Sequence, residues 1–230
     1  MVPWKTLDTI ATHEGALQLR QRGEREFLIT IDGRVLMTSH DRRSELGLAT
    51  LACKGLAGGP RVLIGGLGMA YTVRAALDAL PPGAELVVVE LTPAVAAWCK
   101  GPLAPLTDGA VNDRRVKIVI GDVARVIAKA PRDHYQAIIL DLYEGPHAAT
   151  QRTDDPFYGS EALSRSRAAL APGGVLAVWS EDPDPAFKRR FEHGFYVATH
   201  RIGTVRKHVV YLGRKPAAPP AGRPARGRPR

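Results

Sequence analysis

The stretch RVLIGGLGMAYTVRAALD, residues 61–78, is a short apolar run followed by glycines and an alanine-rich helical pattern. It predicts a strand, a tight turn and a helix. In a doubly wound α/β sheet such a turn lies at the carboxyl end of the first strand, where missing Cβ atoms let a nucleotide-bearing ligand approach the backbone. Gly65, Gly66 and Gly68 are therefore candidate cofactor-binding residues.

Acidic residues follow three predicted strands of the same sheet. Glu90 ends the run LVVV, about the distance after the glycine turn at which a ribose-binding acid is expected. Asp122 follows VKIVIG, and Asp141 follows AIIL. Because the carboxyl ends of parallel strands share one edge, we expect these carboxylates on the edge to which the glycine turn points.

These carboxylates suit a nucleoside and an amine. Glu90 and Asp122 can accept hydrogen bonds from ribose hydroxyls and from an exocyclic amine. Asp141 is expected nearest to the reactive end of the ligand, where a carboxylate can help to deprotonate an attacking amine. Glu144 and Glu181 are expected nearby, in a negatively charged pocket that attracts an amine or a sulfonium. The pattern favours transfer of a group from a sulfonium nucleoside to an amine.

The sequence carries no signature of several other chemistries. It has no nucleophilic-serine elbow, no Walker lysine and no Cys/His cluster, and Cys53 and Cys99 are its two cysteines. We therefore expect neither a metal nor a disulfide framework. No apolar run approaches the roughly 20 residues that span a bilayer, and residues 1–10 lack the pattern of a secretory signal. We expect a cytoplasmic protein without a membrane partner.

The chain divides into three predicted parts. Residues 1–45 are β-rich, with a hairpin turn at Asp32-Gly33, and form a small N-terminal β unit. Residues 46–213 alternate strands and helices and end in an antiparallel strand pair, which predicts a Rossmann-like domain with a mostly parallel sheet. Residues 214–230 are rich in proline, glycine and arginine and are predicted to be disordered.

That tail carries most of the excess charge. The chain has a net charge of +9, and the tail holds six basic residues and no acid, which leaves +3 for the remainder. Any contact with nucleic acid is therefore expected through the tail alone, and a solubilising role explains the same composition.

From residue 28 to residue 212 the order of features resembles the spermidine synthase (polyamine aminopropyltransferase) family, which has the S-adenosylmethionine-dependent methyltransferase fold. The matching features are Asp32-Gly33, Ser44-Glu45, the glycine turn, Glu90, Gly121-Asp122, the loop 141–146, Phe157-Tyr158 and Ala171-Pro172-Gly173-Gly174.

The resemblance implies decarboxylated S-adenosylmethionine as the aminopropyl donor, an amine acceptor and a homodimer formed through the N-terminal region. It places Glu90 on the ribose and Asp122 near the adenine. On this basis we predict Asp141 and Glu144 as catalytic residues. Tyr143 and Glu181 are predicted to contact the acceptor.

The sequence also departs from the family pattern. Gly68 stands where the family carries an acid, Leu142-Tyr143-Glu144 replaces small residues and a second Asp-Pro, and Arg43-Ser44 replaces a Tyr-Gln pair. An acid in the glycine turn would repel the carboxylate that only intact S-adenosylmethionine carries. Because this chain lacks that acid, a methyltransferase that uses intact S-adenosylmethionine is one alternative. A catalytically silent nucleoside-binding protein is another, motivated by Arg43 and the basic tail.

Overall fold

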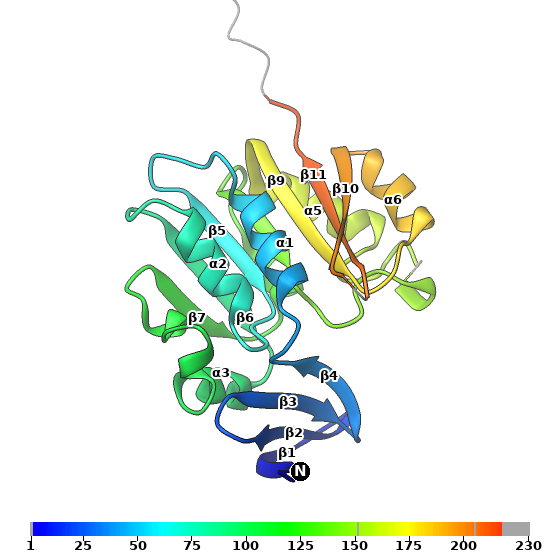
Figure 1. The fold of residues 1–230 in the computed structure, drawn as a ribbon. Helices are drawn as coiled ribbons and strands as arrows, with labels where there is room; N and C mark the ends of the chain where they lie inside the picture. Colours follow the sequence, from blue (N-terminus) through cyan, green and yellow to red (C-terminus); the bar gives the residue numbers. More distant parts are fainter. Residues whose placement is uncertain (1, 151, 205, 218–230) are drawn as a thin grey trace, which may run out of the picture.

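Two β-sheets organise the chain (Figure 1). The computed structural model describes residues 2–150, 152–204 and 206–217. The first sheet is antiparallel, and its four strands lie in chain order. They are β1 (Lys5–Thr12), β2 (Gly15–Arg22), β3 (Glu26–Ile31) and β4 (Arg34–Thr38).

The second sheet has seven strands and is mostly parallel. They are β5 (Arg61–Gly65), β6 (Glu85–Glu90), β7 (Val116–Ile120), β8 (Tyr135–Leu140), β9 (Leu170–Ser180), β10 (Tyr196–Ile202) and β11 (His208–Arg214). Their spatial order is β10-β11-β9-β8-β5-β6-β7, and only β11 runs antiparallel to its neighbours. The predicted doubly wound sheet with a C-terminal antiparallel pair is confirmed.

Helices cover both faces of the second sheet. They are α1 (Arg43–Cys53), α2 (Tyr71–Ala79) and α3 (Pro93–Lys100) on one face, and α4 (Val123–Lys129), α5 (Ser160–Ala169) and α6 (Pro185–Glu192) on the other. Alternation along the strands divides the core accordingly: Val62 and Ile64 pack under the first helix layer, and Leu63 packs under the second. Short 3₁₀ turns span Ala104–Leu106, Ala110–Asn112 and Ala148–Thr150.

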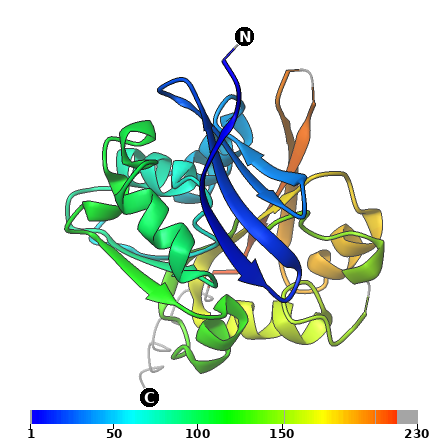
Figure 2. The same cartoon turned by 90° about the horizontal axis from the view of Figure 1, so that it is seen from below.

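The N-terminal sheet lies across the carboxyl ends of the central strands of the larger sheet, where β4 approaches the segments that follow β5 and β8 (Figure 2). Alternation in the sequence predicts strands at residues 16–20, 26–31 and 35–38 but not β1, because a register shift between Thr6 and Asp8 breaks the alternation of apolar residues. The Trp98 indole donates a hydrogen bond of 2.7 Å to the Asp8 carboxylate and so ties β1 to α3. The sheet is therefore anchored on the helix layer formed by α1 to α3.

Two predicted boundaries change. The helix α1 begins at Arg43, so the last residues of the predicted N-terminal unit are helical. Arg214 ends β11 rather than beginning a disordered tail, and the Lys215 amide donates to the Gly174 carbonyl. Residues 218–230 of the predicted tail lie outside the described residues. In the described part of the chain, no helix is long and apolar enough to cross a membrane.

Candidate active site

The glycine turn holds three protein segments close together. Gly66 and Gly68 have φ values of +88° and +51°, which favour glycine. A Cβ atom on Gly66 would overlap the carbonyl oxygen of Asp141, and one on Gly68 would lie 2.9 Å from the Met37 sulfur in β4. The turn therefore lets the loop after β8 and the N-terminal sheet approach the end of β5.

Glu90 is fixed beside this turn. Its carboxylate accepts hydrogen bonds from the backbone amides of Leu67 (3.0 Å) and Thr92 (2.8 Å), one on each oxygen. The residue is only 8% exposed, and burial raises the pKa of its carboxyl while these hydrogen bonds lower it. Each oxygen keeps a second lone pair. Glu90 can therefore still accept hydrogen bonds from a ligand.

Asp122 caps the next helix on the same edge. Its Oδ1 accepts a hydrogen bond of 2.8 Å from the Ala124 amide at the start of α4. Two apolar residues at this edge are exposed to solvent. Leu91 follows β6 and is 64% exposed, and Ile120 ends the neighbouring strand β7 and is 49% exposed. Exposed apolar side chains beside two acids offer a surface on which a nucleobase can pack.

Asp141 is half-buried and lies within electrostatic reach of a second carboxylate. Its amide donates to the Gly65 carbonyl (2.9 Å), and the Thr72 hydroxyl of α2 donates a short hydrogen bond to its Oδ2. Burial and then the negative charge of Glu45 raise the pKa of Asp141 to about 7, whereas the Thr72 hydrogen bond lowers it. Two carboxylates that interact in this way retain a proton more readily than either would alone.

Glu45 comes from α1, far away in the sequence. It is 8% exposed, burial raises the pKa of its carboxyl, and the Ser44 hydroxyl donates a hydrogen bond of 2.6 Å to it. Neither Glu45 nor Asp141 forms an ion pair with any described residue. We call Glu45 and Asp141 the inner pair. The sequence resemblance included Ser44-Glu45, but no local pattern predicted that Glu45 lies within electrostatic reach of Asp141.

Buried polar groups lie close to the inner pair. The charge of Asp141 helps to raise the pKa of Tyr158, so Tyr158 lies within electrostatic reach of Asp141. The charge of His208 lowers the pKa of Glu45, so His208 lies within electrostatic reach of Glu45. The rings of Trp179 and His208 pack 4.9 Å apart. The Tyr158 hydroxyl, Trp179 Nε1 and His208 Nδ1 are buried and lack a hydrogen-bond partner among the described residues. Sequence reasoning missed Thr72 and His208, because single polar residues in a helix and a strand carry no motif.

The other predicted acids lie at the rim and have arginine partners. Arg34 contacts Glu144 at 3.1 Å, and its guanidinium lies 4.9 Å from the centre of the Tyr143 ring. Arg206 contacts Glu181 at 2.5 Å. The Glu181 amide also donates to the Glu144 carbonyl (3.1 Å), so the two rim acids are neighbours. Arg34 and Arg206 therefore offset the negative charge that we expected Glu144 and Glu181 to add to the pocket.

No family model matches the sequence. A segment of 178 residues, 74% of this chain, is 31% identical to polyamine aminopropyltransferase 2 of Streptomyces coelicolor and covers 30% of that protein. A segment of 105 residues, 44% of this chain, is 32% identical to a polyamine aminopropyltransferase of Mycobacterium tuberculosis and covers 19% of it. A segment of 121 residues, 53% of this chain, is 31% identical to putrescine N-methyltransferase 2 of Nicotiana tabacum and covers 32% of it. The matches thus span less than half of each relative.

Solved structures share the fold over most of the chain. The spermidine synthase of Thermotoga maritima superposes with a TM-score of 0.74 at 19% identity, over 93% of this chain and 73% of that one. A spermidine synthase in complex with the transition-state analogue AdoDATO gives the same values. A probable spermidine synthase of Corynebacterium glutamicum gives a TM-score of 0.64 at 18% identity, over 91% and 79%.

Proposed function

Because this chain is a divergent relative of the spermidine synthase (polyamine aminopropyltransferase) family, we propose that it transfers an aminopropyl group from decarboxylated S-adenosylmethionine to an amine. The observation that carries the proposal is the inner pair, Glu45 and Asp141. The buried Glu45 and the half-buried Asp141 form no ion pair with a described residue, and two such carboxylates offer a site for a positively charged acceptor.

The donor fits the neighbouring part of the same edge. Glu90 has lone pairs for the ribose hydroxyls. Asp122 Oδ2 forms no hydrogen bond with a described residue, lies 3.7 Å from Arg125 Nε and can accept a hydrogen bond from the exocyclic amine of an adenine. Leu91 and Ile120 supply apolar surface beside both acids. Gly65, Gly66 and Gly68 let the chain turn closely around this space, so that the sulfonium end of the donor would point towards Asp141.

The chemical step needs a base and a site for one proton. The acceptor nitrogen attacks the propyl carbon bonded to the sulfonium sulfur, so that a C–N bond forms and the C–S bond breaks. Methylthioadenosine leaves as a neutral thioether, and the proton lost by the acceptor nitrogen passes to Asp141. A base with a pKa of about 7 is ionised often enough near neutral pH to accept that proton. Thr72 would orient the carboxylate through its hydrogen bond.

The rim residues would act on the acceptor and on the loop that carries Asp141. Tyr143 and Glu181 remain predicted acceptor contacts, and Glu144 remains a predicted catalytic residue. The ion pair between Arg34 and Glu144 gives that glutamate a second role, because it ties the loop after β8 to the first residue of β4.

Methyl transfer from S-adenosylmethionine to an amine is the second candidate. One relative is named a putrescine N-methyltransferase. The glycine turn also carries no acid that would repel the donor carboxylate, since Gly68 packs against Met37. The inner pair would accept the proton of the amine in either reaction.

A homodimer and a cytoplasmic location complete the proposal. The N-terminal sheet has two edge strands, β1 and β4, and exposes Val35 on β4, which is compatible with pairing through this region. The family resemblance supports both suggestions. Sedimentation of the purified chain tests the first of them.

The decisive experiment uses the full chain and three ligands: methylthioadenosine, S-adenosylmethionine and its decarboxylated form. Isothermal titration measures binding, and mass spectrometry detects transfer onto a panel of diamines and polyamines. We expect tighter binding of the decarboxylated donor and a product heavier by one C3H7N unit. A product heavier by one CH2 unit would support methyl transfer instead. Binding without any product would indicate a silent nucleoside-binding protein, and no binding of the three ligands would overturn both candidate reactions.

A further inference from the structure

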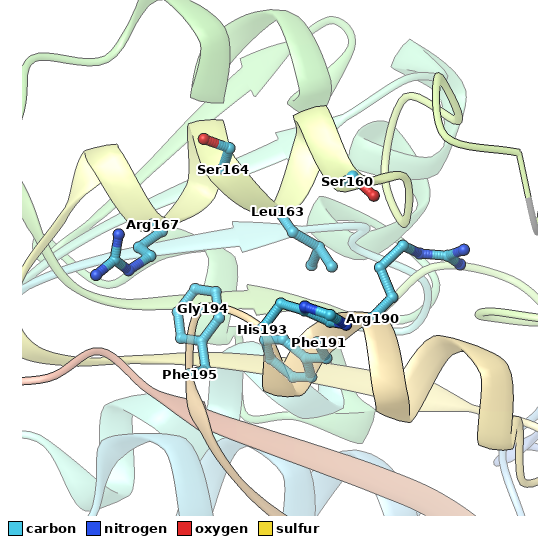
Figure 3. A pocket seen from close by; sticks show the side chains of 9 residues that line it. All are labelled: Ser160, Leu163, Ser164, Arg167, Arg190, Phe191, His193, Gly194 and Phe195. Carbon is cyan, nitrogen blue, oxygen red and sulfur yellow. The ribbon is translucent and has the colours of Figure 1, made fainter.

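The tail of an acceptor amine has a restricted choice of surroundings. The groove between α5 and α6 is not one of them (Figure 3). Its residues belong to the face covered by α4 to α6, none of them is acidic, and Leu163, Phe191 and Phe195 at its floor are buried. Under the proposed function, the tail therefore lies among the residues that surround the inner pair at the carboxyl edge of the sheet.

An aromatic wall, formed by Trp179 and His208, lies on one side of Asp141. Asp141 faces α2, since the Thr72 hydroxyl of that helix donates a hydrogen bond to it. Trp179 of β9 packs against the core of the same face, and its ring centre lies 4.9 Å from that of His208 in β11. Because β8, β9 and β11 are neighbouring strands, these side chains follow one another across the sheet. A tail that leaves Asp141 in this direction meets the wall.

The aromatic wall offers carbon atoms to a ligand. Trp179 and His208 are half-buried, while Trp179 Nε1 and His208 Nδ1 are buried and lack a hydrogen-bond partner among the described residues. The accessible part of the indole ring therefore consists of carbon atoms. An apolar tail can pack on this surface, whereas a second ammonium group would lose water there without gaining a carboxylate.

The two rim acids already have cations. Glu144 lies 3.1 Å from Arg34, and Glu181 lies 2.5 Å from Arg206. Both arginines come from other segments of the chain, so they occupy the positions that the second ammonium group of a diamine would need. That group would have to displace an arginine or lie close to one. The rim therefore disfavours an acceptor whose far end is positively charged.

Two further acids near the inner pair are also engaged. Asp41, whose negative charge raises the pKa of Glu45, forms an ion pair of 3.1 Å with Arg43. Asp155, whose charge raises the pKa of Tyr158, accepts hydrogen bonds on one oxygen from the Tyr158 amide (2.7 Å) and from the preceding amide (3.0 Å). Of these acids, Asp155 alone has no ion-pair partner among the described residues, so it is the position to test for a second ammonium group.

The inner pair suits a single ammonium group. Burial and the charge of Glu45 raise the pKa of Asp141 to about 7, so part of the molecules carry a proton there at neutral pH. The Tyr158 side chain is 3% exposed and lies within electrostatic reach of Asp141, and its hydroxyl lacks a hydrogen-bond partner among the described residues. A primary ammonium group has three N–H donors, which carboxylate and hydroxyl oxygens can accept.

We propose that the acceptor is a primary amine with one positive charge and an apolar tail. This inference rests on the proposed transfer reaction and names its acceptor. The nitrogen would lie at the inner pair, and the tail would pack on the aromatic wall. As the nitrogen forms a C–N bond to the propyl carbon, the C–S bond breaks and methylthioadenosine leaves with its electron pair. The proton lost by the nitrogen passes to Asp141.

Three amines of similar length distinguish the charge at the far end of the acceptor. Pentylamine ends in a methyl group, putrescine ends in a second ammonium group, and aminobutyrate ends in a carboxylate. Steady-state rates of the full chain with the decarboxylated donor give kcat/KM for each. We expect the value for pentylamine to exceed both others by about tenfold or more, because a second charge would lose its hydration without an unpaired opposite charge.

A binding measurement separates this inference from the proposed reaction. Isothermal titration of the chain saturated with methylthioadenosine compares the three amines without turnover. If pentylamine binds most tightly and no amine reacts, the transfer reaction is wrong and the acceptor class is supported. If putrescine or aminobutyrate binds and reacts better than pentylamine, the transfer is supported and the acceptor class is wrong. The absence of measurable pentylamine binding at millimolar concentration would also overturn the acceptor class.

A double variant tests the arginines at the rim. Arg34→Gln, Arg206→Gln leaves both rim acids without their cations, and the two arginine side chains are 57% and 60% exposed, so the fold should persist. The ratio of kcat/KM for putrescine to that for pentylamine should rise by about fivefold or more. A looser loop would affect both amines alike and cancels in this ratio. Arg165→Gln, which releases Glu161 on α5, is the matched control and should leave the ratio unchanged. An unchanged ratio in the double variant would contradict the proposal.

Asp155→Asn tests the remaining position for a second ammonium group. We expect the ratio of putrescine to pentylamine to stay within about twofold of the value for the unmodified chain, since the proposed acceptor has no group at Asp155. A selective loss of putrescine binding and turnover in this variant would show that Asp155 holds a second ammonium group, and the proposal would be wrong.

Discussion

Two pairs of acids at the same edge of the sheet have opposite surroundings. Glu144 and Glu181 lie at the rim, and each contacts an arginine from another segment of the chain. Glu45 is buried, Asp141 is half-buried within its electrostatic reach, and neither forms an ion pair with a described residue. The more exposed acids at the rim therefore each have an arginine within ion-pair distance, whereas the inner acids have no ion-pair partner among the described residues.

The difference separates a structural role from a chemical one. A buried carboxylate without a cation destabilises the folded state, and a second one beside it increases the cost. Such an arrangement persists when a ligand supplies the missing positive charge. The rim pairs instead connect the loop after β8 to the N-terminal sheet and the residues after β9 to the connection between β10 and β11.

The largest expected effect is a loss of transfer activity without a loss of donor binding when Asp141 is replaced. We expect Asp141→Asn to lower kcat/KM for the transfer by about 10²- to 10⁴-fold, because the reaction loses its base. The affinity for methylthioadenosine should stay within about twofold, since Asp141 does not belong to the proposed ribose or adenine contacts. Glu90→Ala is the matched comparison and should weaken nucleoside binding itself. Equal activity of Asp141→Asn and the unmodified chain would remove Asp141 from the mechanism.

Removing Glu45 should change the pH dependence. The negative charge of Glu45 helps to raise the pKa of Asp141 to about 7, so Glu45→Gln should lower that pKa and move the acid limb of the rate profile to lower pH. Rates with one acceptor amine are compared between the two proteins, so that the titration of the amine cancels. Glu161→Gln, at an exposed acid of α5 that pairs with Arg165, is the control and should leave the acid limb in place. An unchanged limb in Glu45→Gln would show that the two inner acids do not interact.

The inner pair should also show its cost in stability. The pKa of Asp141 is raised from 3.8 to about 7 in the folded protein, so the folded state binds more protons between these values and stability falls as the pH rises towards 7. Asp141→Asn should therefore raise the free energy of unfolding by about 1–3 kcal/mol above pH 7, and by less at pH 5. Urea denaturation at pH 8 and pH 5 measures both. A gain that is equal at the two pH values would contradict this account.

The sequence predicted the fold and one half of the site. Strand alternation around the glycine turn and acids at the strand ends are local patterns, and they located Glu90, Asp122 and Asp141 on one edge. The hairpin turn at Asp32-Gly33 was equally local, and both residues have positive φ.

The other half of the site depends on packing between distant segments. Glu45 comes within electrostatic reach of Asp141 because α1 packs on β8 and β9, and Arg34 contacts Glu144 because the N-terminal sheet approaches the loop after β8. Neither contact leaves a period or a spacing in the sequence. For the same reason the sequence predicted that Glu144 and Glu181 carry free negative charge, whereas the fold gives each an arginine.

The smallest expected effect concerns the rim. The side chains of Arg34 and Glu144 are 57% and 30% exposed, and an ion pair so close to solvent contributes about 0–1 kcal/mol. Arg34→Gln should therefore leave the melting temperature nearly unchanged, while a looser loop after β8 raises KM for the amine by about two- to fivefold. Steady-state kinetics over a range of amine concentrations separate KM from kcat.

A double-mutant cycle decides whether this pair acts only through the position of the loop. Arg34→Gln and Glu144→Gln should each raise KM, and the double variant should resemble either single variant, because both remove the same contact. Arg206→Gln on the second rim pair is the matched control for loss of surface charge. If Glu144→Gln instead lowers kcat as strongly as Asp141→Asn while Arg34→Gln does not, then Glu144 takes part in the chemistry as predicted from the sequence. Glu181 would then be the one remaining acid of the two rim pairs without a part in the chemistry.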